Sequence, residues 1–307
     1  MSALPHVDAA GLWSLLPVAD AVDALSRAFA SDEGGGPPRA HVEVPGGDLL
    51  LMPAHAPGGV GVKLVTVAPA NPGLGLPLIH GLYVLFAADT LAPVATIDGA
   101  ALTALRTAAV SALATRHLAR PDASRLLVFG AGTQARSHVA ALRAVRPITH
   151  VMVVARTLAS AAALVEDLRA EGVDARTGTP ASVRSADIVC TCTTSGTPVF
   201  DGTLLAAGTH VNAVGAYRPD ARELDGETLR RGRVVVEDRA AAMAEAGDLL
   251  LAIDEGAITA AHVVADLREL VAGAAVRTSD AQVTVFKSVG LALEDLAVAR
   301  AAVSRLR

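Results

Sequence analysis

The second half of the chain alternates short apolar runs with longer stretches in which apolar residues recur at helical spacing. The expected strands are residues 126–129, 150–154, 188–193, 210–213 and 234–237. The helical stretches fall at residues 133–144, 159–172, 182–185 and 240–246. Strands that alternate with helices are typical of a parallel, doubly wound sheet with right-handed crossovers. The pattern therefore predicts an α/β domain over residues 119–285.

The first part of the chain has a different pattern. Apolar residues recur at helical spacing over residues 18–30, and the Gly/Pro-rich segment 34–38 ends that helix. Short β-like pieces separated by Gly and Pro follow, at residues 41–44, 49–52, 61–67, 81–86 and 94–97. They predict an antiparallel sheet built mainly of hairpins. Residues 100–118 then predict a long alanine-rich helix.

The C-terminal residues return to a helical pattern after the segment 284–290. Val289, Leu293, Leu296 and Val303 give this last helix one apolar stripe, so we expect it to pack back on the first domain. We thus expect two domains, an α+β domain of residues 1–118 and 286–307 and the α/β domain of residues 119–285. A length of 307 residues and a hydrophobic share of 52% suit two domains with sizeable cores.

The first predicted strand and helix of the α/β domain meet in the sequence LLVFGAGTQA, residues 126–135. Gly130 permits a tight turn, Gly132 lets the backbone approach a pyrophosphate, and Ala135 lets the helix pack on the strand. The helix N-terminus offers N–H groups and a positive dipole end to the phosphates. The motif predicts a Rossmann-type dinucleotide site, rather than an ordinary βα turn. Its expected cofactor-binding residues are Gly130, Ala131, Gly132, Thr133 and Gln134.

The second strand of this unit is followed by Arg156 and Thr157. An acidic residue at that point would bind the adenosine ribose hydroxyls and favour NAD. An arginine and a hydroxyl group instead suit a 2′-phosphate, so we expect NADPH to be preferred over NADH. The alternative is a solvated arginine at a strand end.

Two further segments stand at the carboxyl ends of predicted strands, where ligands bind in such sheets. Thr193 closes one strand, and Val214 and Gly215 follow the next. We expect all three residues to contact the cofactor, with Val214 and Gly215 near the nicotinamide.

Three cationic residues are candidates for holding an anionic substrate. Arg39 opens the first β-like piece, Lys63 stands inside an apolar strand, and Arg106 is a single charge in a small-residue helix. Arginine binds a carboxylate through two parallel hydrogen bonds, and lysine adds a mobile charge and a proton. The alternative for each is a surface charge or a structural ion pair. His80 and His210 fit packed or solvated side chains better than catalytic ones.

Charge and composition exclude several classes of protein. A net charge of −5 gives no reason to expect nucleic acid or an anionic membrane as a partner. No apolar run reaches membrane-spanning length, and Met1 to Pro5 lack the pattern of a secretory signal, so we expect a cytoplasmic location. Cys190 and Cys192 are expected to be small core residues in a reducing compartment rather than metal ligands.

Several motifs together resemble the ornithine cyclodeaminase/mu-crystallin family. They match nearly the whole chain in the right order, so the combination is more specific than the glycine motif alone. They are RTAA at residues 106–109, GAGTQA at 130–135, NAVGA at 212–216, RPD and RELD within 218–225, and TVFKSVG at 284–290.

The resemblance implies a substrate domain whose sheet pairs with that of a second subunit, giving a homodimer through the N-terminal sheet. It implies that Lys63 and Arg106 bind the carboxylate of an amino or imino acid, with Arg39 beside them. It also implies that Thr107 and Ser288 lie close to the cofactor.

Two positions depart from the cyclodeaminases that the family includes. Those enzymes carry an aspartate after an Asn-Ala-Val-Gly-Gly motif, where this chain has Tyr217. They carry a glutamate just before a Leu-Met-Pro motif, where this chain has Leu50. Without these carboxylates the second amine of ornithine has no anionic partner, so we do not expect ornithine as the substrate. The chain is more similar to the ketimine reductase branch of the family. The preference of that branch for NADPH fits Arg156 and Thr157.

The sequence therefore predicts an NAD(P)H-dependent reductase of a cyclic imino acid, either 1-pyrroline-2-carboxylate or 1-piperideine-2-carboxylate. Arg106, Arg39 and Lys63 hold the carboxylate in this hypothesis, while Lys63 and Tyr217 are both candidates for supplying a proton to the imine nitrogen. The alternatives are an amino-acid dehydrogenase of the alanine/pyruvate type, a cyclodeaminase, and an NADP-dependent binding protein with little turnover.

Overall fold

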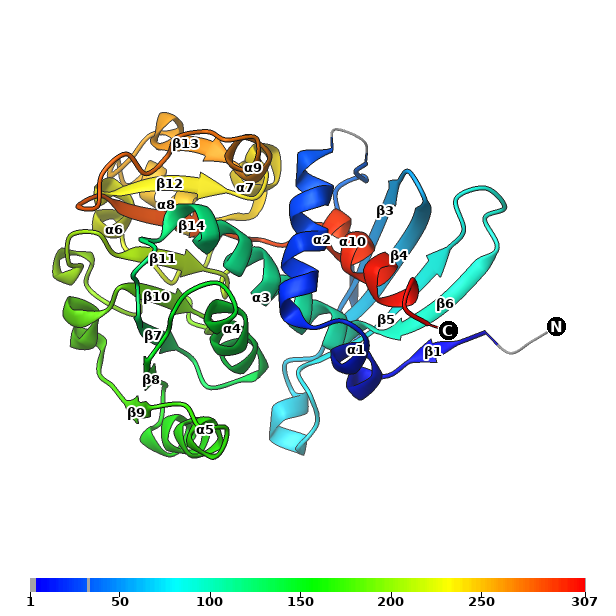
Figure 1. Cartoon of the computed structure of the whole chain (residues 1–307), viewed down its shortest axis with the longest axis horizontal. Helices are drawn as coiled ribbons and strands as arrows, with labels where there is room; N and C mark the ends of the chain where they lie inside the picture. Colours follow the sequence, from blue (N-terminus) through cyan, green and yellow to red (C-terminus); the bar gives the residue numbers. More distant parts are fainter. Residues whose placement is uncertain (1–3, 32–33, 307) are drawn as a thin grey trace. The chain divides into compact units, whose positions relative to one another are not determined.

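The computed structural model describes residues 4–31 and 34–306. The expected absence of a secretory signal at Met1 to Pro5 falls partly on residues 1–3, which lie outside the described residues. The chain forms two compact units, one of residues 1–110 with 291–307 and one of residues 111–290 (Figure 1). Each unit has its own sheet, as the two patterns in the sequence predict.

In the described part of the second unit, eight parallel strands form one sheet in the order β13-β12-β14-β11-β10-β7-β8-β9. The strands are β7 (Arg125–Phe129), β8 (His150–Val154), β9 (Ala175–Thr177), β10 (Ile188–Thr191), β11 (His210–Ala213), β12 (Gly232–Val236), β13 (Val263–Asp266) and β14 (Val283–Lys287). The predicted doubly wound parallel sheet is confirmed. The chain adds β8 and β9 on one side of β7 and then crosses to β10 on the other, so the strand order reverses between β7 and β10.

Helices connect these strands. They are α4 (Thr133–Arg143), α5 (Leu158–Ala170), α6 (Gly226–Arg231), α7 (Arg239–Glu245), α8 (Gly247–Asp254) and α9 (Leu267–Val271), with the 3₁₀ helices η2 (Pro180–Ser185), η3 (Gly202–Leu204) and η4 (Ala260–His262). Aspartate side chains accept a hydrogen bond from the first turn of α6, α7 and α9, which satisfies backbone N–H groups that have no partner within the helix.

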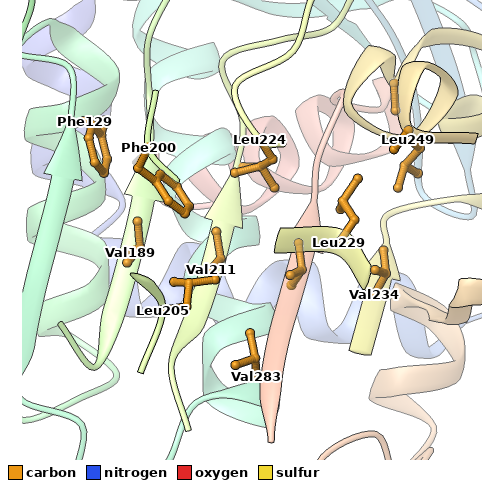
Figure 2. Packing of buried hydrophobic residues seen from close by; sticks show 14 of the residues in the cluster. Phe129, Val189, Phe200, Leu205, Val211, Leu224, Leu229, Val234, Leu249 and Val283 are labelled. Atoms are coloured by element: carbon orange, nitrogen blue, oxygen red, sulfur yellow. The ribbon is translucent and has the colours of Figure 1, made fainter. Parts of the chain in front are cut away.

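The core of the second unit is built from the apolar strands and the helices packed on them. Figure 2 shows Val189, Val211 and Val283 on neighbouring strands, with Leu224, Leu229 and Leu249 from the connecting segments beside them. The rings of Phe129 and Phe200 stack with their centroids 5.5 Å apart. Burial on both faces explains why β7 and β10 consist mainly of apolar residues.

The sheet of the first unit has six strands in its described part, in the order β1-β6-β5-β4-β3-β2. The strands are β1 (His6–Val7), β2 (Ala40–Val44), β3 (Gly47–Ala56), β4 (Gly59–Val67), β5 (Ile79–Phe86) and β6 (Pro93–Asp98). Neighbours from β2 to β6 pair antiparallel as consecutive hairpin partners, which confirms the predicted hairpins. The short β1 adds to β6 in parallel and is absent from the prediction.

The first unit also contains helices, and the C-terminal helix lies against one face of the sheet. The helices are α1 (Ala9–Leu15), α2 (Val18–Ala30), α10 (Ala292–Val303) and the start of α3 (Gly99–Leu118), with η1 (Asn71–Leu74). The C-terminal α10 packs against β3, β4 and β5, and α2 packs on α10 (Figure 1). The expected return of the last helix to the first unit is therefore confirmed.

Some details of the prediction are wrong. The strand before Thr193 ends at Thr191, and Val289 lies outside α10. Two acidic residues, Glu294 and Asp295, are fully buried beside Leu293 on α10, where the prediction has only an apolar stripe. The segment before α10 forms β14 in the middle of the large sheet, between β11 and β12. The strand position depends on long-range pairing, which the local hydrophobic pattern does not encode.

Candidate active site

The glycine turn after β7 has the geometry that its sequence predicts. Gly130 has φ +108°, a conformation that L side chains rarely adopt, and its N–H donates to the carbonyl of Val154. A Cβ at this position would lie 2.4 Å from the carbonyl oxygen of Cys192. Glycine is therefore required here by the backbone itself.

The backbone at Gly132 does not require glycine, but the missing side chain leaves space for a ligand. Gly132 is the N-cap residue of α4 with φ −90°, so its backbone suits any residue, and a Cβ would meet no atom within 4 Å. Among the described residues, no side chain makes a cap hydrogen bond at the N-terminus of α4. Ala135 is fully buried, as close helix packing requires. An open space before an uncapped helix N-terminus fits a dinucleotide pyrophosphate.

The turn lies at the point where the strand order reverses. β7 pairs with β8 on one side and β10 on the other, and the loops that follow β7 and β10 leave next to each other. In open α/β sheets, ligands bind at the carboxyl ends of strands at such a reversal. The fold and the turn therefore select the same edge of the second unit.

Arg156 and Thr157 follow β8 on the surface. Thr157 is the N-cap residue of α5, and its hydroxyl accepts a hydrogen bond from Ser160 N–H. The Arg156 side chain is exposed and has no ion pair within the described residues. An arginine at this position is available to a ligand phosphate.

The loops after β10 and β11 are joined by one carboxylate, Glu223. Its Oε1 accepts hydrogen bonds from Thr193 N–H and Thr193 Oγ1, both at 2.7 Å. Its Oε2 accepts from Thr191 Oγ1 at 2.8 Å and from Gly215 N–H at 2.7 Å. Val214 N–H donates to the carbonyl of Thr191, which adds a backbone bond between the same loops. Burial raises the pKa of Glu223, while Lys287 and the hydroxyl donors favour its ionised form.

A second carboxylate, Glu237, holds the segment after β14. Ser288 Oγ donates to Glu237 Oε1, and the N–H groups of Val289 and Gly290 donate to Oε2. The Ser288 hydroxyl is buried and already bonded, so any contact with a cofactor would add to that bond.

Lys287 and Asp248 complete the polar network of the second unit. Their charged atoms lie 2.7 Å apart, and both side chains are fully buried. Lys287 Nζ also donates to the carbonyl of Ala216, and Asp248 accepts from the N–H groups of Glu223 and Leu224. Asp248 thus holds the segment that carries Glu223, and Glu223 in turn binds the loops that carry Thr193, Val214 and Gly215.

The first unit contains a buried cluster of two cations and two carboxylates, which we call the Lys63–Arg106 cluster. Lys63 on β4 points to the helix-covered face of the sheet, and both oxygens of Asp295 lie 2.7–2.8 Å from its Nζ. Arg106 on α3 donates from Nη1 to Glu294 Oε2 at 2.8 Å, and its Nε lies 3.2 Å from Asp295 Oδ1. These four residues are at least nine-tenths buried.

The electrostatics of the cluster centre on Lys63. Burial lowers its pKa to about 8, Asp295 opposes that shift, and Arg106 and Arg39 add to it. Arg39 is half-buried just before β2, close enough to influence Lys63. Tyr83 lies directly opposite Lys63 on β5, and burial raises the pKa of its phenol, which stays neutral. The structure thus brings together the three predicted cations within one unit.

The remaining predicted residues are more scattered. Thr107 is buried on α3 beside Arg106, while Tyr217 is more than a third exposed in the segment after β11. His80 is exposed, and His210 is buried in β11 with hydrogen bonds to Thr284 and Asn212. Burial lowers the pKa of His210 to about 3, so its imidazole is neutral, as a structural role requires.

The two cysteines lie near the end of β10 and directly after it. Cys190 is buried in β10, and burial raises the pKa of its thiol to about 12. Across residues 4–31 and 34–306, no group of His, Cys, Asp and Glu side chains is arranged to hold a metal ion. Within the same residues, no helix is both long and apolar enough to cross a membrane.

The sequence prediction missed the acidic partners of these sites. Glu294 and Asp295 follow Leu293 on the packed face of α10, and acids flanked by apolar residues at helical spacing are the signal that could have found them. Glu223 and Asp248 gave no comparable signal, because their partners come from distant parts of the sequence.

A parallel sheet with an uncapped glycine turn at its reversal point, joined to a unit with a buried cationic cluster, is the architecture of a dinucleotide-binding protein that handles a small acid. Comparison with known proteins makes the assignment specific. The sequence signature of the ornithine cyclodeaminase/mu-crystallin family matches residues 8–307. The chain belongs to this family, which confirms the resemblance seen in its motifs.

Several relatives are similar over most of the chain. The Delta(1)-pyrroline-2-carboxylate reductase of Bacillus cereus (strain ZK / E33L) is 40% identical over 263 residues, covering 82% of this chain and 79% of that protein. The structure of Thermococcus litoralis Delta(1)-pyrroline-2-carboxylate reductase in complex with NADH and L-proline has a TM-score of 0.94 at 33% identity, covering 98% of this chain and 97% of that one. An archaeal alanine dehydrogenase dimer with bound NAD has a TM-score of 0.90 at 33% identity, covering 98% and 95%.

Proposed function

We propose that this protein is an NAD(P)H-dependent ketimine reductase that converts 1-pyrroline-2-carboxylate to proline or 1-piperideine-2-carboxylate to pipecolate. The observation that carries the proposal is the Lys63–Arg106 cluster, in which two cations are buried side by side within one unit. The similarity to reductases of this class, one of them in complex with NADH and L-proline, supports it.

In this proposal the two units have different tasks. Arg106 and Lys63 bind the carboxylate of the imino acid, and Arg39 adds positive charge beside them. In the second unit the uncapped N-terminus of α4 and the space at Gly132 hold the pyrophosphate, while the loops joined by Glu223 hold the nicotinamide end. The bound dinucleotide supplies the hydride, and the protein supplies orientation and charge.

An imine becomes a better hydride acceptor when its nitrogen is protonated. Lys63, with a pKa of about 8, is mainly protonated at neutral pH and is our first candidate for the proton source. Tyr217 is the second. A Tyr217→Phe variant separates the two, because it keeps the ring and removes the phenolic proton.

The same site disfavours a diamino acid. Leu50 stands where the cyclodeaminases of the family carry a glutamate, and it is buried on the face of β3 that also carries Met52, the residue paired with Lys63. A second amine placed there would meet an apolar side chain, and desolvation of that charge without a partner is costly. We therefore propose a substrate with one charged end.

We further propose that NADPH is preferred and that the protein is a homodimer. Arg156 and Thr157 after β8 supply a guanidinium and a hydroxyl for a 2′-phosphate. The face of the first unit's sheet that faces away from α10 carries Val42, Leu64 and Leu82, all apolar and at least partly exposed. Exposed apolar faces of this kind mark interaction sites, and the archaeal alanine dehydrogenase neighbour is a dimer.

The direct test is the oxidation of NADPH and of NADH with a small panel of cyclic imino acids. Turnover with either imine in the absence of ammonia supports the proposal. Turnover that requires pyruvate and ammonia identifies an amino-acid dehydrogenase, the function of the archaeal neighbour. Thermal stabilisation by NADPH without steady-state oxidation under any of these conditions identifies a binding protein and contradicts the proposal.

A further inference from the structure

The basic residues of this chain are unusually divided between arginine and lysine. Of 26 basic residues only two are lysines, Lys63 and Lys287. Both are about 1% exposed, and each ammonium lies 2.7 Å from an aspartate oxygen. The chain therefore uses arginine at every solvated position and lysine only where a compact cation is enclosed with a carboxylate.

The surroundings of Lys63 come from four elements. Asp295 on α10 contacts Nζ with both oxygens, Arg106 on α3 shares Asp295, and Arg39 acts from the segment before β2. On β5, Tyr83 faces Lys63 across the strand pair. Glu294 is bound to Arg106, so each of the two buried cations contacts a carboxylate of α10.

Without Asp295, the remaining groups around Lys63 favour the neutral amine. Burial and the charges of Arg106 and Arg39 all lower its pKa, and the neutral phenol of Tyr83 adds no opposing charge. Asp295 is the one carboxylate in direct contact with Lys63 among the described residues. Loss of an adjacent opposite charge shifts a pKa by roughly 1–3 units.

We propose that Asp295 and Glu294 are the positioning residues of the substrate site. Asp295 keeps the Lys63 ammonium charged and in place, and Glu294 fixes the orientation of the Arg106 guanidinium. The identity of the substrate carboxylate that these cations receive rests on the function proposed above. The coupling between Asp295 and Lys63 is a property of the folded chain and does not depend on it.

Because the chain has only two lysines, the pKa of Lys63 can be measured directly by NMR. Protein labelled with ¹³C at lysine Cε shows two side-chain resonances, which a Lys63→Met variant assigns. We expect the Lys63 resonance to titrate with a midpoint near pH 8. In Asp295→Asn the midpoint moves down by one pH unit or more, while the Lys287 resonance keeps its wild-type behaviour as an internal reference.

Glu294→Gln is the matched control, because it neutralises the neighbouring residue on α10 without touching Lys63. We expect a smaller downward shift of the Lys63 midpoint in Glu294→Gln than in Asp295→Asn. An unchanged Lys63 midpoint in Asp295→Asn, or equal shifts in the two variants, overturns the proposal. Asp295→Glu keeps the charge and is expected to restore a midpoint closer to that of the wild type.

The folding of Asp295→Asn needs its own control, because loss of the Asp295 carboxylate leaves the buried Lys63 ammonium without its ion-pair partner. If Asp295→Asn does not fold, the double variant Lys63→Met/Asp295→Asn decides the question. Recovery of the wild-type circular dichroism and NADPH binding in the double variant supports the coupling. Failure of the double variant to fold means that Asp295 acts elsewhere, and the proposal is then wrong.

Activity gives a second readout. If protonated Lys63 binds the substrate, kcat/KM falls as the pH rises through the pKa of Lys63, and this fall begins at lower pH in Asp295→Asn. Glu294→Gln raises KM more than it lowers kcat and leaves the position of the fall nearly unchanged. If the wild type reduces no imine while the resonances behave as expected, the proposed function fails and the coupling stands.

Discussion

Lys63 and Arg106 illustrate, at the scale of single residues, how charge is kept inside a small apolar unit. Each is bound to a carboxylate on α10. A buried ion pair contributes little net stability, because desolvation offsets most of the attraction. The cluster therefore adds little to the stability of the fold, which agrees with the substrate-binding role that we propose for its cations.

Arg106→Ala is predicted to lower kcat/KM for the imino acid by at least about a hundredfold, since each charged hydrogen bond lost costs about 1.5–3 kcal/mol. Arg106→Lys keeps the charge and loses the planar fork, so we expect an intermediate loss. Steady-state kinetics at fixed NADPH measure both, and thermal unfolding checks for the unpaired Glu294. Unchanged turnover in a folded Arg106→Ala protein contradicts the assigned role.

Arg156→Ala is predicted to weaken NADPH binding by about tenfold or more and to leave NADH binding nearly unchanged, because only NADPH carries the 2′-phosphate. Fluorescence titration with both dinucleotides gives the ratio of the two dissociation constants. Arg143→Ala, which removes another exposed arginine of the same unit, is the control and leaves that ratio unchanged. Equal weakening of both dinucleotides by Arg156→Ala argues against 2′-phosphate recognition.

At the scale of elements, the glycine turn and the loops beside it behave as one assembly. Gly130 shapes the turn after β7, and Glu223 ties the loops after β10 and β11 together with four hydrogen bonds. Glu237 accepts three hydrogen bonds from the segment that follows β14. Loops at the carboxyl edge of a sheet are usually mobile. Here the hydrogen bonds to Glu223 and Glu237 hold these loops in one conformation.

The two glycines of the turn are predicted to respond differently to substitution by alanine. Gly132→Ala leaves the unfolding temperature close to the wild-type value, because its φ suits alanine and its Cβ enters open space, but it weakens dinucleotide binding by roughly tenfold or more. Gly130→Ala destabilises the fold by at least about 1–3 kcal/mol, since the positive φ and the Cys192 carbonyl both oppose a side chain. Calorimetry and NADPH titration of both variants measure the contrast. Tight NADPH binding by Gly132→Ala would place the pyrophosphate elsewhere.

At the scale of the whole molecule, each unit has its own sheet and its own polar cluster. The sheet of the first unit has one face covered by α10 and an opposite face that exposes apolar side chains, among them Val42, Leu64 and Leu82. A sheet usually has both faces covered, or has one covered face and polar side chains on the exposed face. A second copy of the chain is the partner that we propose for this face.

Leu64→Asp is predicted to convert the dimer to a monomer, because it places a charge in the middle of the proposed interface. Size-exclusion chromatography with light scattering measures the mass. Leu158→Asp, on a strongly exposed leucine of α5, is the matched control and leaves the mass unchanged. A monomeric wild type, or a Leu64→Asp protein that stays dimeric, contradicts the interface.

Much of the fold was predictable because local patterns encode it. Alternating apolar runs and helical stretches predicted the parallel sheet, and Gly130, Gly132 and Ala135 stand where the dinucleotide turn needs them. The same patterns failed to place β14 between β11 and β12, since strand order is decided by pairings between distant segments. Short elements such as β1 and α9 were missed because a few residues carry too little periodicity.

The sequence by itself determined the fold class and the family, because local patterns and motifs of neighbouring residues encode them. It also singled out Lys63, Arg106 and Arg39 as candidate substrate-binding residues. Only the tertiary structure decided which carboxylates accompany them. Asp295 is 232 positions from Lys63, and Glu294 is 188 from Arg106. Their pairing exists only after α10 returns to the first sheet, since side-chain contacts over such separations depend on the packing of whole elements.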